Sequence, residues 1–139
     1  MLANACYIFG MNTKYPSLSR KILIVDDDFI LRQFMATVLL SCGFICVCAE
    51  DGLAAIDLLK NDSFDMMISD IEMPRLNGLE LLSHVKNSYP ETKIIMISGK
   101  QRPNDAMGCL STKGAHHFLA KPFPVSLFLS TVSTILHLP

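Results

Sequence analysis

Residues 66–74 read MMISDIEMP, an apolar run that ends abruptly in the carboxylate of Asp70. Two other apolar runs also end in charge: ILIVDD at 22–27 ends in two acids, and FLAKP at 118–122 ends in Lys121 and a proline. Short, nearly continuous apolar runs are typical of strands that are buried on both faces of a parallel sheet. The sequence therefore predicts three buried strands whose ends carry three acids and a lysine.

From Lys21 onward, five such runs alternate with stretches whose apolar residues recur at spacings of three and four, as on one face of a helix. Gly43, Gly52, Pro90 and Gly114 separate the elements. Five strands that alternate with five helices predict right-handed crossovers and a parallel sheet covered on both faces. The predicted strands are Ile22–Val25, Phe44–Cys48, Asp65–Ser69, Lys93–Ile97 and His116–Leu119.

Length and composition favour one folded domain. The chain has 139 residues, of which 50% are hydrophobic and 18% charged, so we expect a packed core rather than disorder. Residues 1–20 show no sustained periodicity and are interpreted as a flexible N-terminal leader, which leaves 21–139 as the domain. The five cysteines have no paired Cys or His cluster near them, which favours buried, reduced thiols over a zinc site.

The charge balance excludes some classes of function. The net charge is −1 and no Lys/Arg-rich block is present, so nucleic-acid binding is not expected. No apolar stretch approaches the ~20 residues that span a bilayer, and the N-terminus lacks the pattern of a signal peptide. We therefore expect a cytoplasmic protein without membrane insertion.

Polar side chains follow four of the predicted strands. They are Asp26 and Asp27, Asp70, Ser98 and Lys121. In an open parallel α/β sheet, ligands bind beyond the carboxyl ends of the strands, and all of these groups fall on that edge. Residues that served only solubility would scatter over both edges, so the convergence predicts a binding site.

The residue types at this edge predict metal-assisted phosphate chemistry. Three adjacent carboxylates repel one another unless a cation lies among them. Oxygen ligands without His or Cys select a hard ion, which we expect to be Mg²⁺, with Mn²⁺ as an alternative. Lys121 and the Ser98 hydroxyl could contact phosphoryl oxygens, and Asp70 could act as a nucleophile that forms an acyl phosphate.

Each of these residues also has a purely structural interpretation. An acid that follows a strand often caps the next helix, and Asp28 is predicted to cap the first one. Lys-Pro is common in turns, and a lone serine carries little information. The coincidence of all of them at matching strand ends favours a site.

Four motifs in order resemble the receiver domain of two-component response regulators. They are ILIVDDD at 22–28, DIEMPRLNG at 70–78, IIMISG at 94–99 and KPF at 121–123. The resemblance covers about residues 21–138. It implies a flavodoxin-like (βα)5 fold, which is a doubly wound, five-stranded parallel sheet in strand order 2-1-3-4-5 with helices on both faces.

The resemblance also implies a role for each site residue. Asp70 resembles the phosphorylated aspartate. Asp27 resembles the acid that holds Mg²⁺ directly, and Asp26 the one that holds it through water. The backbone carbonyl of Glu72 resembles the main-chain metal ligand, and Ser98 the hydroxyl that takes part in the switch.

Further positions belong to the same resemblance. Lys121 takes the place of the lysine that contacts the phosphate, with a cis peptide bond before Pro122. Phe118 takes the place of the switch aromatic, which is often tyrosine. The positions that flank the site are Pro74, Gly99, Lys100 and Pro122.

The implied function is a phosphoacceptor switch rather than an enzyme, apart from its own phosphotransfer and autodephosphorylation. Phosphate would come from a histidine kinase or a histidine phosphotransfer protein. It would then change the surface of the fourth helix, fifth strand and fifth helix for a downstream protein target. Because the sequence ends after the fifth helix, we expect a stand-alone receiver that resembles the chemotaxis regulators. Residues 123–139 contain no Asp, Glu, Lys or Arg, which argues against the charge-based dimer of the family, so we expect a monomer or weak dimer.

Two other functions are compatible with these residues. One is an aspartate-nucleophile phosphatase that acts on a small phosphate ester, with Glu72 as general acid. The other is a pseudo-receiver that binds its partners without phosphate. Retention of the acids, the lysine and the hydroxyl argues against the second.

Overall fold

A computed structural model describes residues 20–99 and 114–138. Within these ranges the elements are β1 Lys21–Val25, α1 Phe29–Ser41, β2 Ile45–Ala49, α2 Gly52–Asn61, β3 Met66–Asp70, α3 Gly78–Ser88, β4 Lys93–Ser98, β5 His117–Ala120 and α5 Val125–Ile135. The predicted strands agree with these bounds to within one residue at either end. The predicted fourth helix and the leader, except Arg20, lie outside the described residues.

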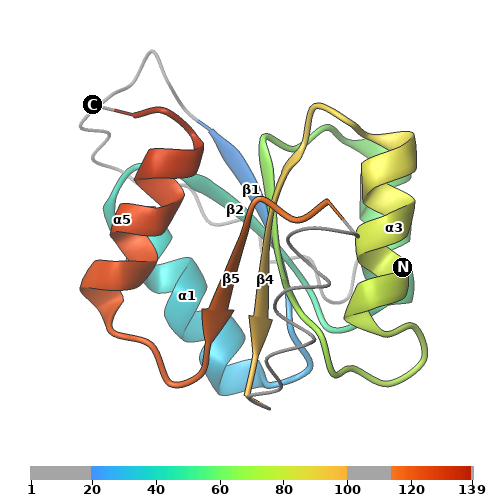
Figure 1. Cartoon of the computed structure of the whole chain (residues 1–139), viewed down its shortest axis with the longest axis horizontal. Helices are drawn as coiled ribbons and strands as arrows, with labels where there is room; N and C mark the ends of the chain where they lie inside the picture. The colour runs from blue at the N-terminus through green and yellow to red at the C-terminus, as the bar shows by residue number, and fades with distance from the viewer. Residues whose placement is uncertain (1–19, 100–113, 139) are drawn as a thin grey trace.

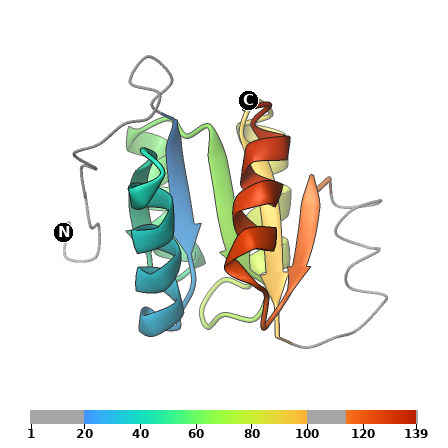
Figure 2. The same ribbon diagram turned by 90° about the vertical axis from the view of Figure 1, so that its left-hand side faces the viewer.

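The five strands form one sheet in the order β2-β1-β3-β4-β5, and every neighbouring pair is parallel. Helices α1 and α5 cover one face and α2 and α3 the other (Figures 1 and 2). This arrangement confirms the predicted doubly wound sheet and its strand order. No helix of the described chain is long and apolar enough to span a membrane.

The apolar runs are continuous because the sheet is buried on both faces. In β1, Ile22 and Ile24 belong to the apolar cluster on the side of α1 and α5. Leu23 and Val25 belong to the cluster on the side of α2 and α3. Since successive side chains of a strand point to opposite faces, a strand inside two clusters must be apolar at every position.

The prediction for the cysteines is right in part. Cys46 and Cys48 are buried in β2 on the α1–α5 side, as expected for structural thiols. Cys42 is exposed because it occupies the C-cap of α1, beyond the last buried turn. The other two cysteines lie outside the described residues.

Two helices begin directly at the edge of the sheet where the acids gather. Asp28 caps α1 as predicted, and its Oδ1 accepts the backbone N–H groups of Ile30 at 3.0 Å and Leu31 at 3.3 Å. Helix α3 begins at Gly78, whose N–H donates to the Ile71 carbonyl at 2.8 Å. A Cβ atom on Gly78 would lie 2.1 Å from the Asp70 carbonyl oxygen, so the helix can approach the strand only with glycine here.

Substitution of Gly78 by alanine is expected to destabilise the fold, because the backbone after β3 must move to admit the methyl group. Urea unfolding should show a loss of ~1–3 kcal/mol in the free energy of unfolding. Gly99→Ala is the matched control, since the nearest atom to its added Cβ is the Lys121 Cδ at 3.8 Å. The control should change the stability by no more than ~0.5 kcal/mol. Equal stabilities of the two variants would contradict the close approach of α3.

Candidate functional site

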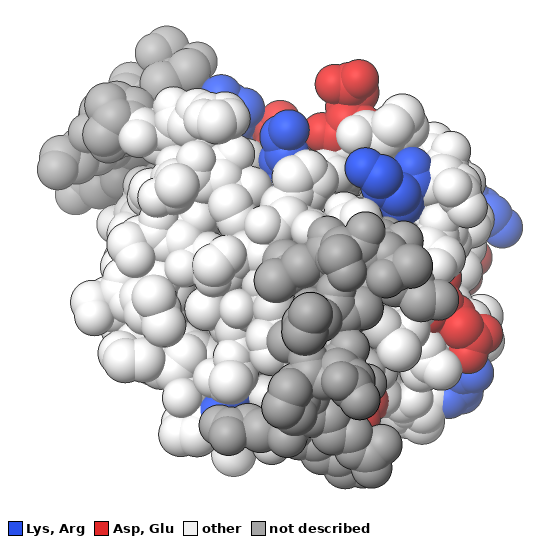
Figure 3. Space-filling view, in the orientation of Figure 1, with Lys and Arg blue, Asp and Glu red and all other residues white. Residues whose placement is uncertain are grey.

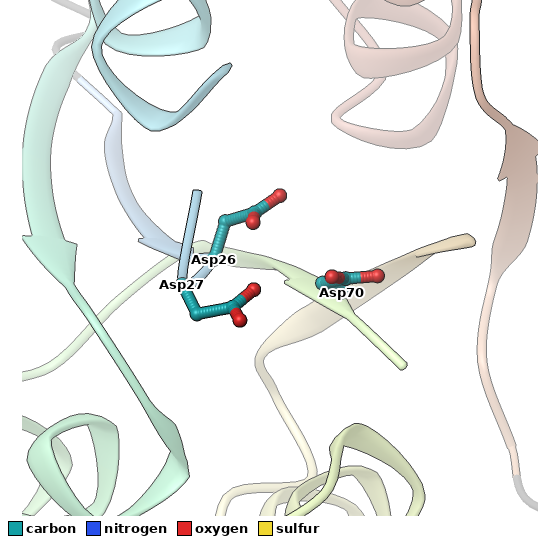
Figure 4. A group of neighbouring side chains, drawn as sticks. All are labelled: Asp26, Asp27 and Asp70. Atoms are coloured by element: carbon teal, nitrogen blue, oxygen red, sulfur yellow. The ribbon is translucent and has the colours of Figure 1, made fainter. Parts of the chain in front are cut away.

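Three carboxylates meet beyond the ends of two neighbouring strands. Asp26 and Asp27 follow β1, and Asp70 is the last residue of β3. One oxygen from each lies within 4.8 Å of the others (Figure 4). Asp26 is 0% exposed and Asp70 5%, whereas Asp27 is open to solvent. The cluster is therefore a partly buried acidic pocket with one exposed member.

Lys121 bridges the two buried acids from the end of β5. Its Nζ lies 3.2 Å from Asp26 Oδ2 and 3.3 Å from Asp70 Oδ2. Since β4 separates β5 from β3, the long lysine side chain is what connects the two ends. The Lys121–Pro122 peptide bond is cis, as expected.

Burial dominates the electrostatics of this pocket. It raises the pKa of Asp70 to about 6; Lys121 opposes that change, and Asp26 and Glu72 add to it. Burial also raises the pKa of Asp26, against the N–H of Asp28 and the charge of Lys121. For Lys121 itself burial lowers the pKa, but the two carboxylates outweigh burial and the pKa is raised overall. The single positive charge of Lys121 therefore does not neutralise the negative charge of the three carboxylates.

An orphaned atom in the pocket fits a bound cation. Asp70 Oδ1 is buried and has no hydrogen-bond partner among the described residues. A buried carboxylate oxygen without a partner is unfavourable unless a proton, a donor or a metal ion meets it. The donor set is made of carboxylate oxygens, which suits a hard ion such as Mg²⁺. Asp26, Asp27 and Asp70 are the side chains that would hold it.

Ser98 lies at the end of β4, next to this pocket, and is fully buried. Its Oγ donates a hydrogen bond to Glu72 Oε1 at 3.0 Å. Sequence reasoning placed the backbone carbonyl of Glu72 at the site but missed this role of its side chain. The pairing joins the end of β4 to the loop after β3, and no local pattern predicts a contact between residues 26 positions apart.

The structure describes all but one of the remaining predicted residues. Phe118 is half-buried in β5 and packs against the cluster on the α2–α3 side. Pro74 is exposed in the loop that leads to α3, and Gly99 is exposed beside Lys121. Lys100 lies outside the described residues.

Two arginines near the site were not predicted. Arg32, on the buried face of α1, donates to the backbone carbonyl of Asp26 at 2.5 Å and packs over the Phe29 ring. Arg75, which has a positive φ of 70°, pairs with the buried Asp51 at 3.2 Å. A charged residue inside the apolar stripe of α1 was the available signal for Arg32, whereas nothing local indicated Arg75.

Asp70→Asn is expected to stabilise the metal-free protein at neutral pH. Burial on folding raises the pKa of Asp70 from its ordinary value of 3.8 to about 6, so the ionised form of this carboxyl opposes folding. Stability should therefore fall as the pH rises through this window, and the asparagine variant should avoid the loss. Each tenfold change in proton affinity corresponds to ~1.4 kcal/mol, which predicts a difference on the order of 1–3 kcal/mol.

Urea unfolding in EDTA at several pH values checks this prediction. The advantage of Asp70→Asn should be largest above about pH 6 and should vanish below about pH 4. An asparagine variant that is less stable than the wild type at neutral pH would contradict it.

Comparison with known proteins agrees with this geometry. Residues 22–133 match the family described as response regulator receiver domain. The chain is 37% identical over 107 residues to the Regulator of RpoS of Escherichia coli K12, covering 77% of this chain and 32% of that protein. It is 29% identical over 119 residues to response regulator MprA of Mycobacterium bovis, and the match covers 86% of this chain and 51% of that protein. The chain thus spans about a third to a half of the length of these relatives.

Solved structures give the same fold. Chemotaxis response regulator CheY4 of Vibrio cholerae superposes with a TM-score of 0.78 at 30% identity, covering 84% of this chain and 98% of that one. Response regulator TrrA of Thermotoga maritima, in complex with Mg²⁺ and BeF, superposes with a TM-score of 0.73 at 24% identity, with coverages of 84% and 98%. Because the identity to TrrA is only 24%, this similarity is evidence for the fold alone. Because the match to the family extends over most of this chain, the chain belongs to the receiver domains of the response regulators of two-component signalling.

Proposed function

We propose that this receiver domain accepts a phosphoryl group on Asp70 from a phosphohistidine of a histidine kinase or a histidine phosphotransfer protein. The observation that carries the proposal is the convergence of Lys121 and the acidic pair on Asp70, whose Oδ1 is buried without a partner. Receiver domains as a family are phosphoacceptor switches that bind Mg²⁺ at an acidic pocket.

The transfer needs few covalent steps. A carboxylate oxygen of Asp70 attacks phosphorus, the P–O bond forms, and the P–N bond to the donor imidazole breaks. The imidazole leaves with the bonding electron pair, and the product on this chain is an acyl phosphate. Later attack of water on phosphorus breaks the P–O bond and restores the carboxylate. The nucleophile must be ionised, which the ion pair with Lys121 favours.

Charge stabilisation is the main task of the pocket. A phosphoryl group carries negative charge into a site that already holds three carboxylates. When bound by Asp26, Asp27, Asp70 and the backbone carbonyl of Glu72, Mg²⁺ would offset that charge. Lys121, held within 3.3 Å of Asp70, is placed to contact a phosphoryl oxygen.

Phosphorylation would be read at the surface formed by β5 and the elements beside it. Ser98 is next to the pocket, and its hydroxyl could turn toward a phosphoryl oxygen. Phe118, half-buried two strand residues before the end of β5, could then move inward. This surface would present a different shape to a downstream protein.

An apolar surface lies directly beside the acidic pocket and suits a protein donor. A cavity of about 510 Å³ lies between the first turns of α1 and residues 121–123, which lead from β5 to α5. Phe29 is 62% exposed, Ile30 78% and Phe34 42%. The face over α5 is nearly free of charged side chains (Figure 3). The residues that line the cavity are Asp28, Ile30, Leu31, Phe34, Lys121, Pro122 and Phe123.

A donor that delivers a phosphohistidine to Asp70 must cover this surface, because Lys121 belongs both to the acidic pocket and to the cavity wall. Exposed apolar side chains that become buried stabilise such a complex by roughly 25 cal/mol per Å². We therefore assign the surface around Ile30 and Phe34, here called the α1–α5 face, to the phosphodonor.

The phosphatase alternative has less support. Its general acid would be Glu72, but the Glu72 carboxylate accepts the hydrogen bond of Ser98. A pseudo-receiver would not need Lys121 to bridge two buried acids, yet that bridge is intact.

Modification of Asp70 is the direct test of the proposed function. With Mg²⁺ and acetyl phosphate, the wild type should gain one phosphoryl group by intact mass and lose it with time. Asp70→Asn should gain no phosphoryl group, because the amide of asparagine is not a nucleophile. Lys121→Ala should be slowed ~100-fold or more, since a charge that stabilises the transition state is lost. Mg²⁺-independent labelling, or labelling of Asp70→Asn, would contradict the proposal.

The α1–α5 face is tested with a charge placed on it. Ile30→Asp should slow transfer from a phosphorylated histidine phosphotransfer protein roughly tenfold or more, because the carboxylate must be buried without a partner. Labelling by acetyl phosphate should not change. Leu53→Asp, at a 42% exposed position on α2, is the matched control and should leave both reactions unchanged. If Ile30→Asp and Leu53→Asp slowed transfer from the phosphotransfer protein equally, the α1–α5 face would be excluded as the binding surface of the phosphodonor.

A further inference from the structure

The hydrogen bond between Ser98 and Glu72 connects the end of β4 with the loop after β3. Asp70 pairs with Ile97 in the sheet register, and the Ile71 N–H donates to the Ile97 carbonyl at 2.9 Å. This register places Ser98 beside the residues that follow Asp70. The Ser98 Oγ then reaches Glu72 Oε1 at 3.0 Å.

This hydrogen bond competes with capture of a phosphoryl group. A serine hydroxyl carries one proton, so it cannot donate to the Glu72 carboxylate and to a phosphoryl oxygen together. A hydrogen bond to an ionised acceptor is roughly twice as strong as one between neutral groups. The Ser98 hydroxyl must therefore leave a strong acceptor before it can contact phosphate on Asp70.

The bond is not needed to hold the loop in place. The Gly78 N–H donates to the Ile71 carbonyl at 2.8 Å, and Arg75 pairs with Asp51 at 3.2 Å. These contacts tie both halves of the loop to the rest of the domain. Glu72 itself is only half-buried, so its side chain is free to turn toward solvent once the hydroxyl departs.

We propose that Glu72 is a positioning residue that restrains the Ser98 hydroxyl in the unphosphorylated protein and so makes the phosphorylated state harder to reach. The inference rests on the proposed role of Asp70 as phosphoacceptor. Glu72 acts in two separable ways: its charge repels the incoming group, and its oxygen holds the hydroxyl. Glutamine keeps an acceptor oxygen without the charge, whereas alanine removes both.

The two effects can be separated by measuring the affinity for beryllium fluoride, a phosphoryl analogue, in saturating Mg²⁺. Glu72→Gln should bind it more tightly than the wild type, because a negative charge is removed. Glu72→Ala should bind it more tightly again, by roughly three- to tenfold over Glu72→Gln, since a hydrogen bond contributes about 0.5–1.5 kcal/mol. In a Ser98→Ala background, Glu72→Ala and Glu72→Gln should bind it equally.

The controls distinguish this inference from the function on which it rests. Mg²⁺ affinity without beryllium fluoride should be the same for Glu72→Ala and Glu72→Gln, because the backbone carbonyl is unchanged. Equal beryllium fluoride affinities of these two variants with Ser98 present would overturn the restraint. A difference in beryllium fluoride affinity between Glu72→Ala and Glu72→Gln that persists in the Ser98→Ala background would also overturn the restraint. If the wild type does not bind beryllium fluoride in a Mg²⁺-dependent manner at all, both the proposed function and this inference fail.

Discussion

The site depends on an excess of negative charge that the fold confines to one small volume. Asp26 and Asp70 are withdrawn from water, and Lys121 is shared between them because its Nζ is almost equidistant from both. Burial strengthens this attraction, but it also makes the surplus carboxylate charge unfavourable. A divalent ion would neutralise the carboxylate charge that Lys121 alone leaves unbalanced, and it would also offset the negative charge that a phosphoryl group brings into the site. The expected affinity of the site for a divalent ion is therefore a consequence of how the acids are buried.

Parallel strands are what bring these charges together. The order β2-β1-β3-β4-β5 sets Asp26 beside Asp70, and the length of a lysine side chain crosses the remaining distance from β5. Helix α3 must begin against the end of β3, and Gly78 allows it to do so. The residues that determine the fold at this edge are thus also the walls of the site, so substitutions there affect stability and binding together.

Most of the fold could be predicted because a strand buried on two faces has to be largely apolar, as Ile22–Val25 of β1 and Met66–Ile68 of β3 are. The same reasoning located Asp70 and Lys121, since charge directly after such a run must lie at the sheet edge. The side-chain partners could not be predicted. Arg75 meets Asp51, and Ser98 meets Glu72, only after loops of particular conformation bring distant segments together. Periodicity carries no information about those loop conformations.

On the proposed function, different residues would carry out phosphotransfer and select the donor. The acids and Lys121 would act alike on any phosphoryl group, because charge does not distinguish one donor from another. The apolar side chains around Ile30 and Phe34 can discriminate, since their burial depends on the shape of the protein that covers them. Because Lys121 borders both regions, a donor that fits the α1–α5 face would also be brought to Asp70. Exchange of the exposed residues of α1 would then change the donor without altering the reaction.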